Sequence, residues 1–572
     1  LVSVDIVTDK YEINPATANL VNGVTTFAFV PVVAGTHTVK AQSAWLPALT
    51  STYFTPNAGY AETNPVKVWW NYGAKLVLVA EGDSLDPGKP PYNTDPSVGG
   101  RAGTAGPLIA GVTSTLNVYL TDNYFNVVTG TTPFLAVSSN TPVVAVSFLN
   151  DPNIALRGFV PAPKSLIAGA TNFNFIPVTR NQPPDPGMTG LEVRVVDTGG
   201  TGTQFSTDTI GGITVNAGVS ARLQLVVWPE VAAEGTLLGK TGTAGPLIAG
   251  TSYTITVRAV DQYYNRDKTD GRSVRVTSND IYAYHPNPLP MANGQAVFGA
   301  PGFLPSAATG NLVINAVDAD TKNPKLSTDT SSGITVDPGA TARMIVVLPT
   351  QYLVPGKVAA PFGVAGDIST QTAGAQFPIM VYASDWRGNR VYGLDRSPIR
   401  ITSDDTFAPL IGNYSMTGGS VAVSNVALRS AGVRYLTADD QSGAGPSLGA
   451  VNNSGTFNLN PSGATKLRAL VPGESRVPGS TANGRTGTPD PDLQVGVTFY
   501  VTVDLTDYAW NLTPGASQEI RLRADNAYTD ITPSTQVIVG SATFTVYPRK
   551  AGPTVFTAEM VLPVPPWGPS LL

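Results

Sequence analysis

The sequence predicts an all-β protein, a tandem array of antiparallel β-sandwich domains that forms an elongated rod. Three observations lead to this prediction: an internal repeat, a composition rich in strand-forming and turn-forming residues, and short stretches in which apolar and polar residues alternate. The repeat is the strongest of them, because residues 103–111 recur letter for letter at residues 242–250. Each copy is one structural unit, so function has to be sought in an array rather than in one pocket.

Two further markers extend the repeat through the rest of the chain. An Asp-x-x-x-Asn turn occurs four times, with a glycine eleven residues before each Asp, at residues 122–126, 261–265, 385–389 and 507–511. Successive turns lie 139, 124 and 122 residues apart, which is the size of an ordinary domain. A polar cluster that ends a neighbouring strand repeats at 138–140, 277–280, 402–405 and 524–526, and once more at 7–9.

These markers divide the 572 residues into six segments. They are a partial repeat that matches the second half of a unit (1–59), an insertion or linker (60–73), three repeats (74–218, 219–339 and 340–463) and a repeat that lacks its last strand (464–572). Three to five residues with Pro or Gly join one repeat to the next, so we expect a semi-rigid rod. Either the sequence is a window on a longer array, or neighbouring subunits donate the missing strands in a head-to-tail polymer.

Each repeat contains several stretches with a period of two residues, broken by Gly, Pro, Asn or Asp. In residues 252–260, alternate side chains from Tyr253 to Ala259 fall on one face, so one side of the strand packs inward. The same pattern occurs at 114–120, 377–381 and 499–505. Several short strands in a unit of this size indicate an antiparallel β-sandwich.

The composition argues against several classes of function. Only 13% of the residues are charged, the net charge is −5 and no cluster of Lys or Arg is present, so nucleic acid is not an expected partner. The lack of cysteine rules out disulfides, thiolate metal sites and a cysteine nucleophile, and it fits an exported protein. No apolar run approaches the roughly 20 residues of a transmembrane helix.

The repeats share an ordered set of short motifs. The first is Ala-Gly-x-x-aromatic-x-(Ile/Val)-x-Val-x-Ala-x-Asp-x-x-x-Asn, followed by Val-x-(Ser/Thr)-Ser-(Asn/Asp), by Gly-x-Ala-x-Phe, as at 294–298 and 540–544, and by (Ile/Phe)-Thr-Val-(Asn/Asp)-Pro-Gly. This order resembles the bacterial immunoglobulin-like, invasin-like tandem repeats of large surface proteins, over nearly all of the chain. The resemblance implies immunoglobulin-like sandwiches and an extracellular or cell-surface location, but such motifs specify a fold far better than a task.

The Asp-x-x-x-Asn turns allow two interpretations. Closely spaced carboxylate and amide oxygens suit Ca²⁺, but each copy guarantees far fewer than the roughly six oxygens that this ion takes. We favour a structural use, in which the Asp accepts backbone N–H bonds and the Asn takes a left-handed conformation. Better candidates for a metal site are the acidic pairs Asp318 with Asp320 and Asp439 with Asp440, for which loop solvation is the competing interpretation.

No catalytic constellation is expected. The two histidines, His37 and His285, lie in different repeats, which argues against a Ser/His/Asp triad. Similar acids recur in every unit, which indicates structural use rather than paired-carboxylate catalysis. The chain is therefore predicted not to be an enzyme, and Ca²⁺ is the one cofactor considered.

Tryptophans are the candidates for an assembly interface. Trp69, Trp70 and Trp567 suit inter-subunit contacts or a platform for carbohydrate stacking. The competing interpretation is that Trp69 and Trp70, on opposite strand faces, wedge the irregular first joint.

The leading hypothesis is a structural subunit of an extracellular or cell-surface filament, sheath or surface layer. Its partner would be itself, joined head to tail or laterally, with strand exchange at the incomplete ends. The main alternative is the stalk of a surface adhesin that binds glycan or protein through variable loops. A third hypothesis is a non-catalytic accessory region of a secreted enzyme.

Overall fold

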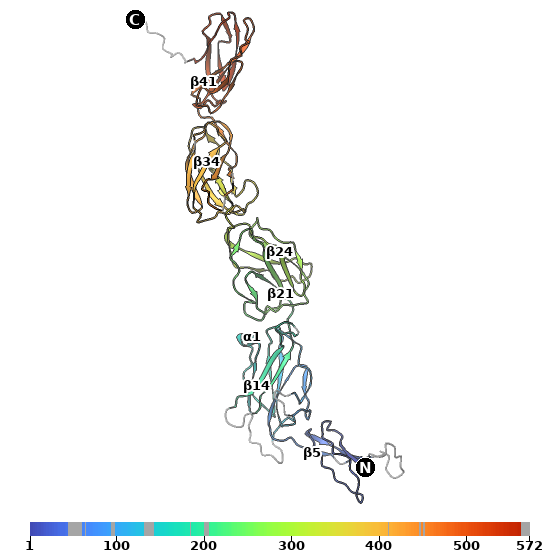
Figure 1. Ribbon diagram of the computed structural model, residues 1–572. Helices are drawn as coiled ribbons and strands as arrows, with labels where there is room; N and C mark the ends of the chain where they lie inside the picture. The colour runs from blue at the N-terminus through green and yellow to red at the C-terminus, as the bar shows by residue number, and fades with distance from the viewer. Residues whose placement is uncertain are drawn as a thin grey trace, which may run out of the picture.

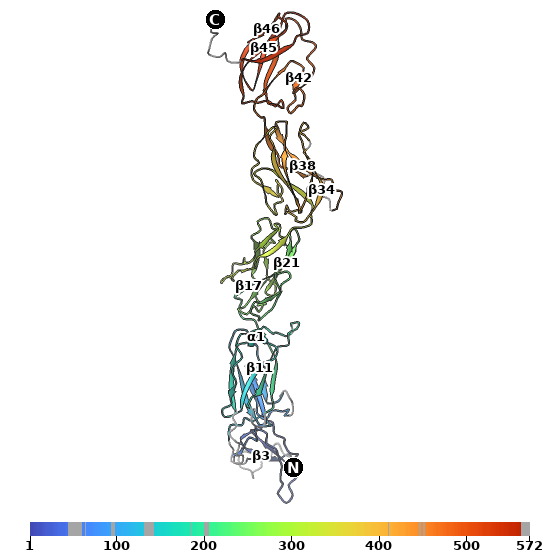
Figure 2. The ribbon, with the colours of Figure 1, turned by 90° about the vertical axis from the view of Figure 1, so that its left-hand side faces the viewer.

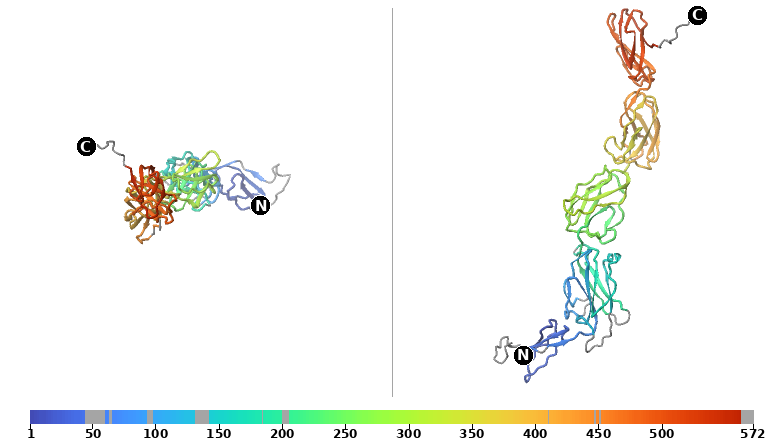
Figure 3. Two further views of the ribbon diagram at one scale, coloured as in Figure 1. Left: turned by 90° about the horizontal axis from the view of Figure 1, so that it is seen from above. Right: turned by 180° about the vertical axis from the view of Figure 1, so that it is seen from behind.

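The computed structural model describes residues 1–43, 60–62, 65–92, 98–130, 142–183, 185–199, 205–409, 411–445, 448–449 and 452–561. They form a row of β-sandwich units stacked end to end as an elongated rod (Figures 1 and 2). From above, the N-terminal unit lies to one side of the others (Figure 3). The chain is thus an all-β tandem array of immunoglobulin-like sandwiches, as predicted. We name the units the half-domain (1–68), domain 1 (75–216), domain 2 (222–337), domain 3 (343–460) and domain 4 (466–560).

Domain 2 shows the arrangement that the complete domains share. Its strands are β17 (Arg222–Val227), β18 (Val231–Ala232), β19 (Lys240–Thr241), β20 (Leu247–Ile248), β21 (Tyr253–Val260), β22 (Ser273–Ser278), β23 (Leu289–Pro290), β24 (Gln295–Phe303), β25 (Thr309–Leu312), β26 (Ile314–Asp318), β27 (Asp329–Thr330) and β28 (Ile334–Asp337). One sheet has the order β17–β21–β24 and the facing sheet the order β23–β22–β26–β27. In a third, small sheet the last strand, β28, lies between β20, to which it is parallel, and β25, to which it is antiparallel.

Domains 1 and 3 repeat this plan. Domain 1 contains β6 (Lys75–Ala80), β7 (Asp83–Leu85), β8 (Arg101–Gly103), β9 (Leu108–Ile109), β10 (Ser114–Thr121), β11 (Val143–Phe148), α1 (Pro152–Leu156), β12 (Lys164–Ser165), β13 (Ala170–Phe175), β14 (Leu191–Asp197), β15 (Asp208–Ile213) and β16 (Val215–Asn216). Domain 3 contains β29 (Arg343–Val347), β30 (Tyr352–Leu353), β31 (Val364–Ala365), β32 (Gln371–Thr372), β33 (Phe377–Ser384), β34 (Arg396–Ser403), β35 (Gly412–Met416), β36 (Ser420–Val426), β37 (Gly432–Arg434), β38 (Leu436–Asp440), β39 (Asn452–Asn453) and β40 (Phe457–Asn460). In both, the last strand again pairs in parallel with a short early strand, β16 with β9 and β40 with β32.

The core of each of domains 1 to 3 lies between its two main sheets, whereas the main strands of domain 4 form one continuous seven-stranded sheet around its core. In domain 2, Ile255 and Val257 of β21 pack with Val274 and Val276 of β22, and all four side chains are fully buried. The alternation read from residues 253–259 therefore places the inward face correctly. Burying one such side chain stabilises a fold by about 1.5–3 kcal/mol, and a separate cluster of this kind gives each of domains 1 to 4 its own core.

The half-domain extends further along the chain than the sequence suggested. Its sheet has the order β1–β3–β4, and β2 pairs with β5; the bounds are β1 (Val2–Ile6), β2 (Gly35–His37), β3 (Val39–Ser43), β4 (Tyr60–Glu62) and β5 (Val66–Val68). Both β4 and β5, whose residues were expected within an insertion at 60–73, are therefore strands of this unit. The motif at 54–59 that suggested an earlier end lies outside the described residues. Val66-Lys67-Val68 alternates as the last strands of the complete domains do, and it is the strand that leads into domain 1.

Domain 4 has the opposite character, because the described residues include its early strands but not its late ones. The strands are β41 (Lys466–Leu470), β42 (Glu474–Arg476), β43 (Arg485–Gly487), β44 (Phe499–Thr506), β45 (Ser517–Ala524), β46 (Thr529–Thr532), β47 (Thr535–Val539), β48 (Ser541–Pro548) and β49 (Phe556–Met560). Within residues 452–561 no strand follows β49, so nothing there corresponds to β27 or β28 of domain 2.

Candidate functional site: the joints between domains

The four Asp-x-x-x-Asn turns all lie at the joints of the rod. Each turn directly follows a long central strand, β10, β21, β33 or β44, and contacts the preceding unit. The repeated element of the sequence is therefore the element that joins one domain to the next.

At the joint between domains 1 and 2, Asp261 closes the turn and holds the linker. Its Oδ1 accepts hydrogen bonds from the N–H groups of Tyr263 at 2.8 Å and Asn265 at 3.0 Å. Its Oδ2 accepts one at 2.8 Å from the N–H of Gly218, in the linker before domain 2. The carboxylate is buried, and these bonds offset the cost of its burial. The structural interpretation of the Asp is confirmed.

Asn265 extends the turn into domain 1. Its Nδ2 donates to the carbonyl of Val178 at 2.7 Å, and its Oδ1 accepts from the N–H of Arg180 at 2.8 Å. A second bond from Nδ2 to Asp261, at 2.9 Å, fixes the side chain, which is fully buried. A primary amide offers a donor and an acceptor side by side, so it pairs with the backbone of domain 1 as a strand would.

The expectation that the Asn takes a left-handed conformation is wrong. The positive φ falls on the residue before it, at Phe125, Tyr264, Gly388 and Trp510, with φ between 63° and 79°. In domain 2 the ring of Tyr264 lies against Gly239, and the guanidinium of Arg222 stands 5.0 Å from its centre. An aromatic residue in this conformation costs about 1–3 kcal/mol, and the packing of its ring holds it there.

The same bonds recur at the other three joints. The Asn Oδ1 accepts from the preceding unit at 2.7–2.8 Å, in the pairs Asn126 with Ala34, Asn389 with Ala308 and Asn511 with Ala431. The Asn Nδ2 donates at 2.7–2.8 Å to the carbonyls of Val32, Ser306 and Arg429. The Asp accepts the linker N–H at 2.7–3.1 Å, in the pairs Asp122 with Asn71, Asp385 with Gly339 and Asp507 with Ser462. We call each buried Asp and Asn pair, with these bonds, a clasp.

The segment that each clasp grips is itself held by a second buried carboxylate. In domain 2, Asp280 accepts from the N–H groups of Ser306 at 2.7 Å and Ala307 at 2.9 Å, and the next N–H, of Ala308, goes to Asn389. Asp9, Asp151 and Asp405 hold the equivalent segments of the other units. Burial acts to raise the pKa of Asp405, but hydrogen bonds from Ser430, Arg429 and Phe407 outweigh it and hold that pKa below its usual value.

Sequence reasoning missed Asp151. The sequence predicted the corresponding polar cluster at residues 138–140, which lie outside the described residues. The strand that leads to Asp151 is β11, which ends at Phe148. Asp151 also caps α1, by accepting from the N–H of Asn153 at 3.2 Å. An Asp followed directly by Pro is a helix-start signal, and it was the clue available in the sequence.

The marker glycines also lie at the joints. Gly374 of domain 3 has φ of +80°, and a Cβ atom added to it would collide with the ring of Tyr508 of domain 4. A Cβ atom at Gly111 would come within 3.0 Å of the Tyr263 ring, whereas one at Gly250 would make only ordinary contact with Arg387, at 3.5 Å. The glycine that stands eleven residues before one clasp therefore serves the clasp of the following domain.

The joint between domains 1 and 2 has additional contacts. Tyr263 of domain 2 belongs to the core of domain 1, with its ring 6.3 Å from that of Phe159. Arg180 of domain 1 pairs with Glu234 of domain 2 at 2.9 Å and with Asp185 of its own domain at 2.6 Å. Lys268 of domain 2 also pairs with Asp185. Hydrogen bonds from Lys268 and Arg180 lower the pKa of Asp185 to about 2.

The proposed metal residues lie in two separate places and are bonded to protein donors. Asp318 accepts from Arg272 at 2.7 Å and from the N–H of Leu326 at 2.9 Å, and Asp320 accepts from the N–H of Ser273 at 2.8 Å. In domain 3, Asp439 pairs with Arg400 at 3.2 Å and Asp440 accepts from the N–H of Ser442 at 3.0 Å. No group of three or more acidic or histidine side chains suited to a metal ion occurs in the described part of the chain.

The candidate interface tryptophans are placed only in part, because Trp567 lies outside the described residues. Trp69 and Trp70 stack edge to face with their ring centres 5.5 Å apart. Trp70 packs against the core of domain 1, and the ammonium group of Lys67 lies 3.6 Å from the centre of a Trp69 ring. Both tryptophans lie at the first joint, after the end of β5 rather than on opposite faces of a strand, and their role as an assembly interface stays a prediction.

The two histidines lie in different units. His37 bonds to Thr8 at 2.8 Å and to the carbonyl of Val33 at 2.6 Å, within the half-domain. His285 bonds to Ser278 at 2.9 Å, but the nearby Asp280 carboxylate is taken up by backbone N–H groups. Among the described residues His285 makes no hydrogen bond to a carboxylate.

Comparison with known proteins identifies no family for the chain. No family model matches it, and no curated protein matches it. Among solved structures, FdeC, an adhesin of Escherichia coli, is 13% identical with a TM-score of 0.24, over 68% of this chain and 98% of that one. The FN1–FN3 domains of chicken CNTN1 are 11% identical with a TM-score of 0.20, over 62% of this chain and 100% of that one.

A further match is β-glucuronidase 3 of Bacteroides uniformis, 13% identical with a TM-score of 0.15, over 46% of this chain. The match spans only 25% of that enzyme. No helix within the described ranges is long and apolar enough to cross a membrane.

Proposed function

We propose that the chain is a structural subunit of an extracellular or cell-surface filament, sheath or surface layer, in which a row of clasped sandwiches supplies length and stiffness. The observation that supports this most is the recurrence of one clasp at all four joints, with cross-joint distances that agree within 0.1 Å. A flexible string of domains has no use for a buried, fully bonded Asp and Asn at every joint.

The chemistry of the chain supports a mechanical role outside the cell. It contains no cysteine, and each of domains 1 to 4 is held by its own apolar core and by backbone pairing. We further propose that subunits associate with themselves, head to tail or side by side, and that the chain carries no catalytic activity. Exposed valines along the sheets offer surface for lateral packing, as at Val297, Val433 and Val537.

Electron microscopy of the native material, without added partners, tests this proposal. We expect regular filaments, tubes or sheets whose repeat is a small multiple of the domain spacing. Dispersed rods with no ordered contacts would contradict a structural subunit and would favour the stalk of an adhesin. Flexible, randomly bent chains would contradict the stiff joints as well.

A further inference from the structure

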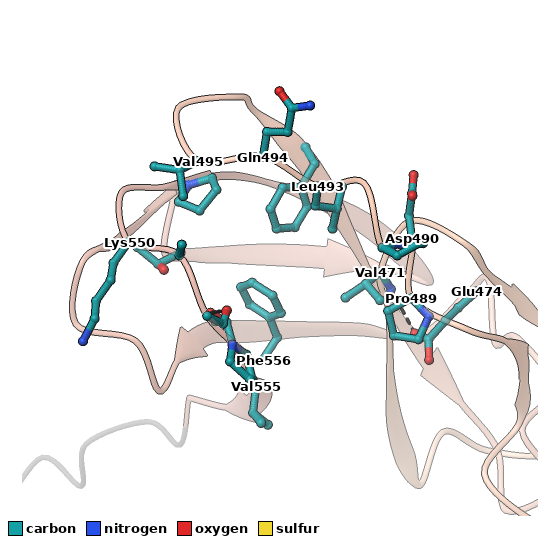
Figure 4. Close-up of a pocket in the computed structure, with 18 of the residues that line it drawn as sticks. Val471, Glu474, Pro489, Asp490, Leu493, Gln494, Val495, Lys550, Val555 and Phe556 are labelled. Atoms are coloured by element: carbon teal, nitrogen blue, oxygen red, sulfur yellow. Dashed lines mark hydrogen bonds between the residues drawn. The ribbon is translucent and has the colours of Figure 1, made fainter.

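Domain 3 carries charged and aromatic side chains on the outer face of its sheet β29–β33–β36, the face turned away from the core. The segment that contains β30 and β31 covers one part of this face, and the rest is open. The open part indicates the chemistry of a partner. The apolar groove of about 760 Å³ in domain 4 does not, because the described residues around it, such as Leu493 and Phe556, do not show what covers it (Figure 4).

Two arginines stand on this face, one on each side of Ser384. Arg343 of β29 pairs with Ser384 of β33, and Arg390, directly after the clasp turn, pairs with Ser384 from the other side. Directly opposed residues of antiparallel strands point to the same face with their Cβ atoms about 5 Å apart, so the two arginine side chains start about 10 Å apart. Ser384 is fully buried between them. The two guanidinium groups therefore belong to one surface.

Neither arginine forms an ion pair within the described part of the chain. The ion pairs of domain 3 use three other arginines, Arg396, Arg400 and Arg434. Arg390 donates to two neutral acceptors, the carbonyl of Gly418 at 3.4 Å and the hydroxyl of Ser420 at 3.1 Å. The Nε atoms of Arg343 and Arg390 are buried without a hydrogen-bond partner. Two positive charges thus lie side by side with no acid to balance them.

The two carboxylates in this region are already used by backbone groups. Asp385 accepts from three backbone N–H groups at 2.7–2.9 Å, and Asp395 accepts from the N–H of Gly418 at 2.8 Å. Burial lowers the pKa of Arg343, and the attraction of Asp385 does not offset this effect. A partly buried charge without a counter-ion is unfavourable, so an anion from outside would stabilise this face.

Aromatic rings flank both guanidinium groups. The Cζ atom of Arg343 lies 4.4 Å from the centre of a Trp386 ring, and that of Arg390 lies 4.9 Å from Tyr382 and 4.5 Å from Tyr392. Such stacking holds a guanidinium group in a fixed orientation. Trp386 is 67% exposed and Tyr392 is 69% exposed, so both also offer ring surface to a partner.

The clasp of this joint does not need these residues. The counterparts of Trp386 in domains 1, 2 and 4 are Asn123, Gln262 and Tyr508, and those of Arg390 are Val127, Arg266 and Leu512. The clasp bonds are nevertheless the same at all four joints. In domain 2, the second arginine, Arg266, is bonded to Gln295 at 2.7 Å. The open arginine pair with an exposed tryptophan is therefore a feature of domain 3 and not a requirement of the rod.

From the arginines the face continues as an open strip along β36. Its outward residues are small, because Ser420 is followed by Ala422 and Ser424, of which the last two are exposed. Met380 of β33 pairs with Ala422, and a hollow of about 250 Å³ lies at this end of the strip. Residues 420 to 424 span about 13 Å at the rise of a strand. The site as a whole is long and shallow, which suits an extended ligand.

We propose that this face of domain 3 binds an acidic polysaccharide. The guanidinium groups of Arg343 and Arg390 take carboxylate groups of the sugars, to which a planar pair of N–H donors is matched. The rings of Trp386 and Tyr392 pack against the C–H faces of sugar rings, and the polymer continues along β36. This inference goes beyond the proposed function and does not depend on assembly of the chain.

An extended peptide fits the face less well than a polysaccharide. A peptide strand binds a sheet at its edge, where free N–H and C=O groups are available to it. The arginines flank β33, which lies inside the sheet and is already paired with β29 and β36. A peptide on this face would leave its own backbone groups without partners from the sheet. A polysaccharide has no amide backbone to pair.

Binding of an oligomer of galacturonic acid to the full chain tests the proposal. The control is the same oligomer with its carboxylates converted to methyl esters, so that the sugars stay and the charge is removed. In calorimetric titration we expect the acidic oligomer to bind at least about tenfold more tightly than the ester, and to bind more weakly as salt is added. Equal affinity for the two oligomers, or no binding of the acidic one, would overturn the proposal.

Variants place the binding on domain 3. We expect Arg390→Gln and Trp386→Ala each to weaken binding of the acidic oligomer at least about tenfold. The matched control is Arg400→Gln, which removes the same charge from an exposed position of β34 in the facing sheet and should leave binding unchanged. Thermal unfolding checks that each variant is folded, and Trp386→Ala, at an exposed side chain, keeps the test valid if Arg390→Gln unfolds. Binding that survives both changes, or that Arg400→Gln weakens equally, would refute the assignment.

Two other occupants are separate outcomes of the same measurements. If a peptide of six glutamates binds as tightly as the acidic oligomer, and Arg390→Gln abolishes this, the site takes acidic peptides and the proposal is wrong. If chains associate without sugar, and Trp386→Ala separates them, the face is a contact between copies and the proposal is also wrong. Because the titration uses dispersed chains, it can fail while microscopy still shows filaments, so this inference and the proposed function fail separately.

Discussion

Replacing Asn265 with alanine removes two of the bonds that cross the joint between domains 1 and 2. In the intact protein the N–H of Arg180 lies 2.8 Å from Oδ1 of Asn265, and the carbonyl of Val178 lies 2.7 Å from its Nδ2. The substitution leaves both backbone groups without these partners. Alanine is too small to reach either group. The other three joints keep their clasps, so the change affects only the joint between domains 1 and 2.

The expected cost follows from the burial of these groups. A buried polar group that loses its partner costs about 1–3 kcal/mol, so two such groups cost about 2–6 kcal/mol. Each 1.4 kcal/mol is a factor of ten in an equilibrium constant, so the opening of the joint should become at least about 30-fold more frequent. Water that enters the gap bonds to the two backbone groups and reduces the free-energy cost, so we use the lower end of the range, about 2 kcal/mol.

Hydrogen exchange at the N–H of Arg180 reports this opening directly. A second readout uses two spin labels, which the cysteine-free chain allows at Arg194→Cys in domain 1 and Arg275→Cys in domain 2. In Asn265→Ala we expect faster exchange at Arg180 and a broader distribution of label distances. The matched control is Asn172→Ala, at an exposed position of β13. If Asn265→Ala leaves the exchange rate and the distance distribution at wild-type values, the clasp does not hold the joint and the reasoning is refuted.

Three other predictions concern Gly374 and Asp185 at the joints and Asp318 within domain 2. Gly374→Ala should lower the melting temperature of domains 3 and 4 more than Gly393→Ala does. Both positions have positive φ, +80° and +76°, but only a Cβ atom at residue 374 would meet a side chain, that of Tyr508. Equal shifts of the melting temperature in calorimetry would contradict this close approach. The folded pKa of Asp185, about 2, lies below its ordinary 3.8, so the ion pairs of Asp185 stabilise the fold above about pH 4, and this stabilisation is lost as the pH falls through 2. The difference in thermal stability between wild type and Asp185→Asn should therefore be constant from pH 7 to 4 and vanish near pH 2. A difference that does not depend on pH would refute this prediction. Because Asp318 is already bonded to Arg272 and to the N–H of Leu326, millimolar Ca²⁺ should not raise the melting temperature of domain 2, whereas a rise that Asp318→Asn abolishes would restore the metal assignment.

The sequence predicts the strands and the turns well because both depend on local chemistry. Alternation in residues 253–259 is enough to place Ile255 and Val257 in the core, and an Asp two residues before a free N–H is enough to predict its hydrogen bond. The period of the repeat then fixes the number of units.

The role of the joints could not be predicted from one repeat, because it depends on contacts between two. Asn265 meets Arg180, 85 residues away in the chain, and Gly374 meets Tyr508. The turn preference of Asn predicts the positive φ at the Asn, whereas it falls on the preceding residue at all four turns, including Gly388, which has no ring to pack. The strand at residues 66–68 was missed because its pairing partner, β2, is remote in sequence.

A clasp binds backbone groups, so the same clasp can form at any joint, whatever the sequence of the two domains that it connects. The gripped residues are Val32 and Ala34 at one joint and Arg429 and Ala431 at another, yet the bonds are the same because only N–H and C=O groups take part. Side chains add what distinguishes the joints, as Arg180 and Glu234 do between domains 1 and 2.

The end of domain 4 differs from the other joints in this respect. Asn526 stands where the other units have the Asp that holds the gripped segment; its Nδ2 donates to the carbonyl of Lys550 at 3.3 Å, and its Oδ1 accepts from the N–H of Tyr528 at 3.1 Å. A carboxylate accepts with both oxygens and an amide with only one, so the segment at 549–551 is held less firmly for a clasp.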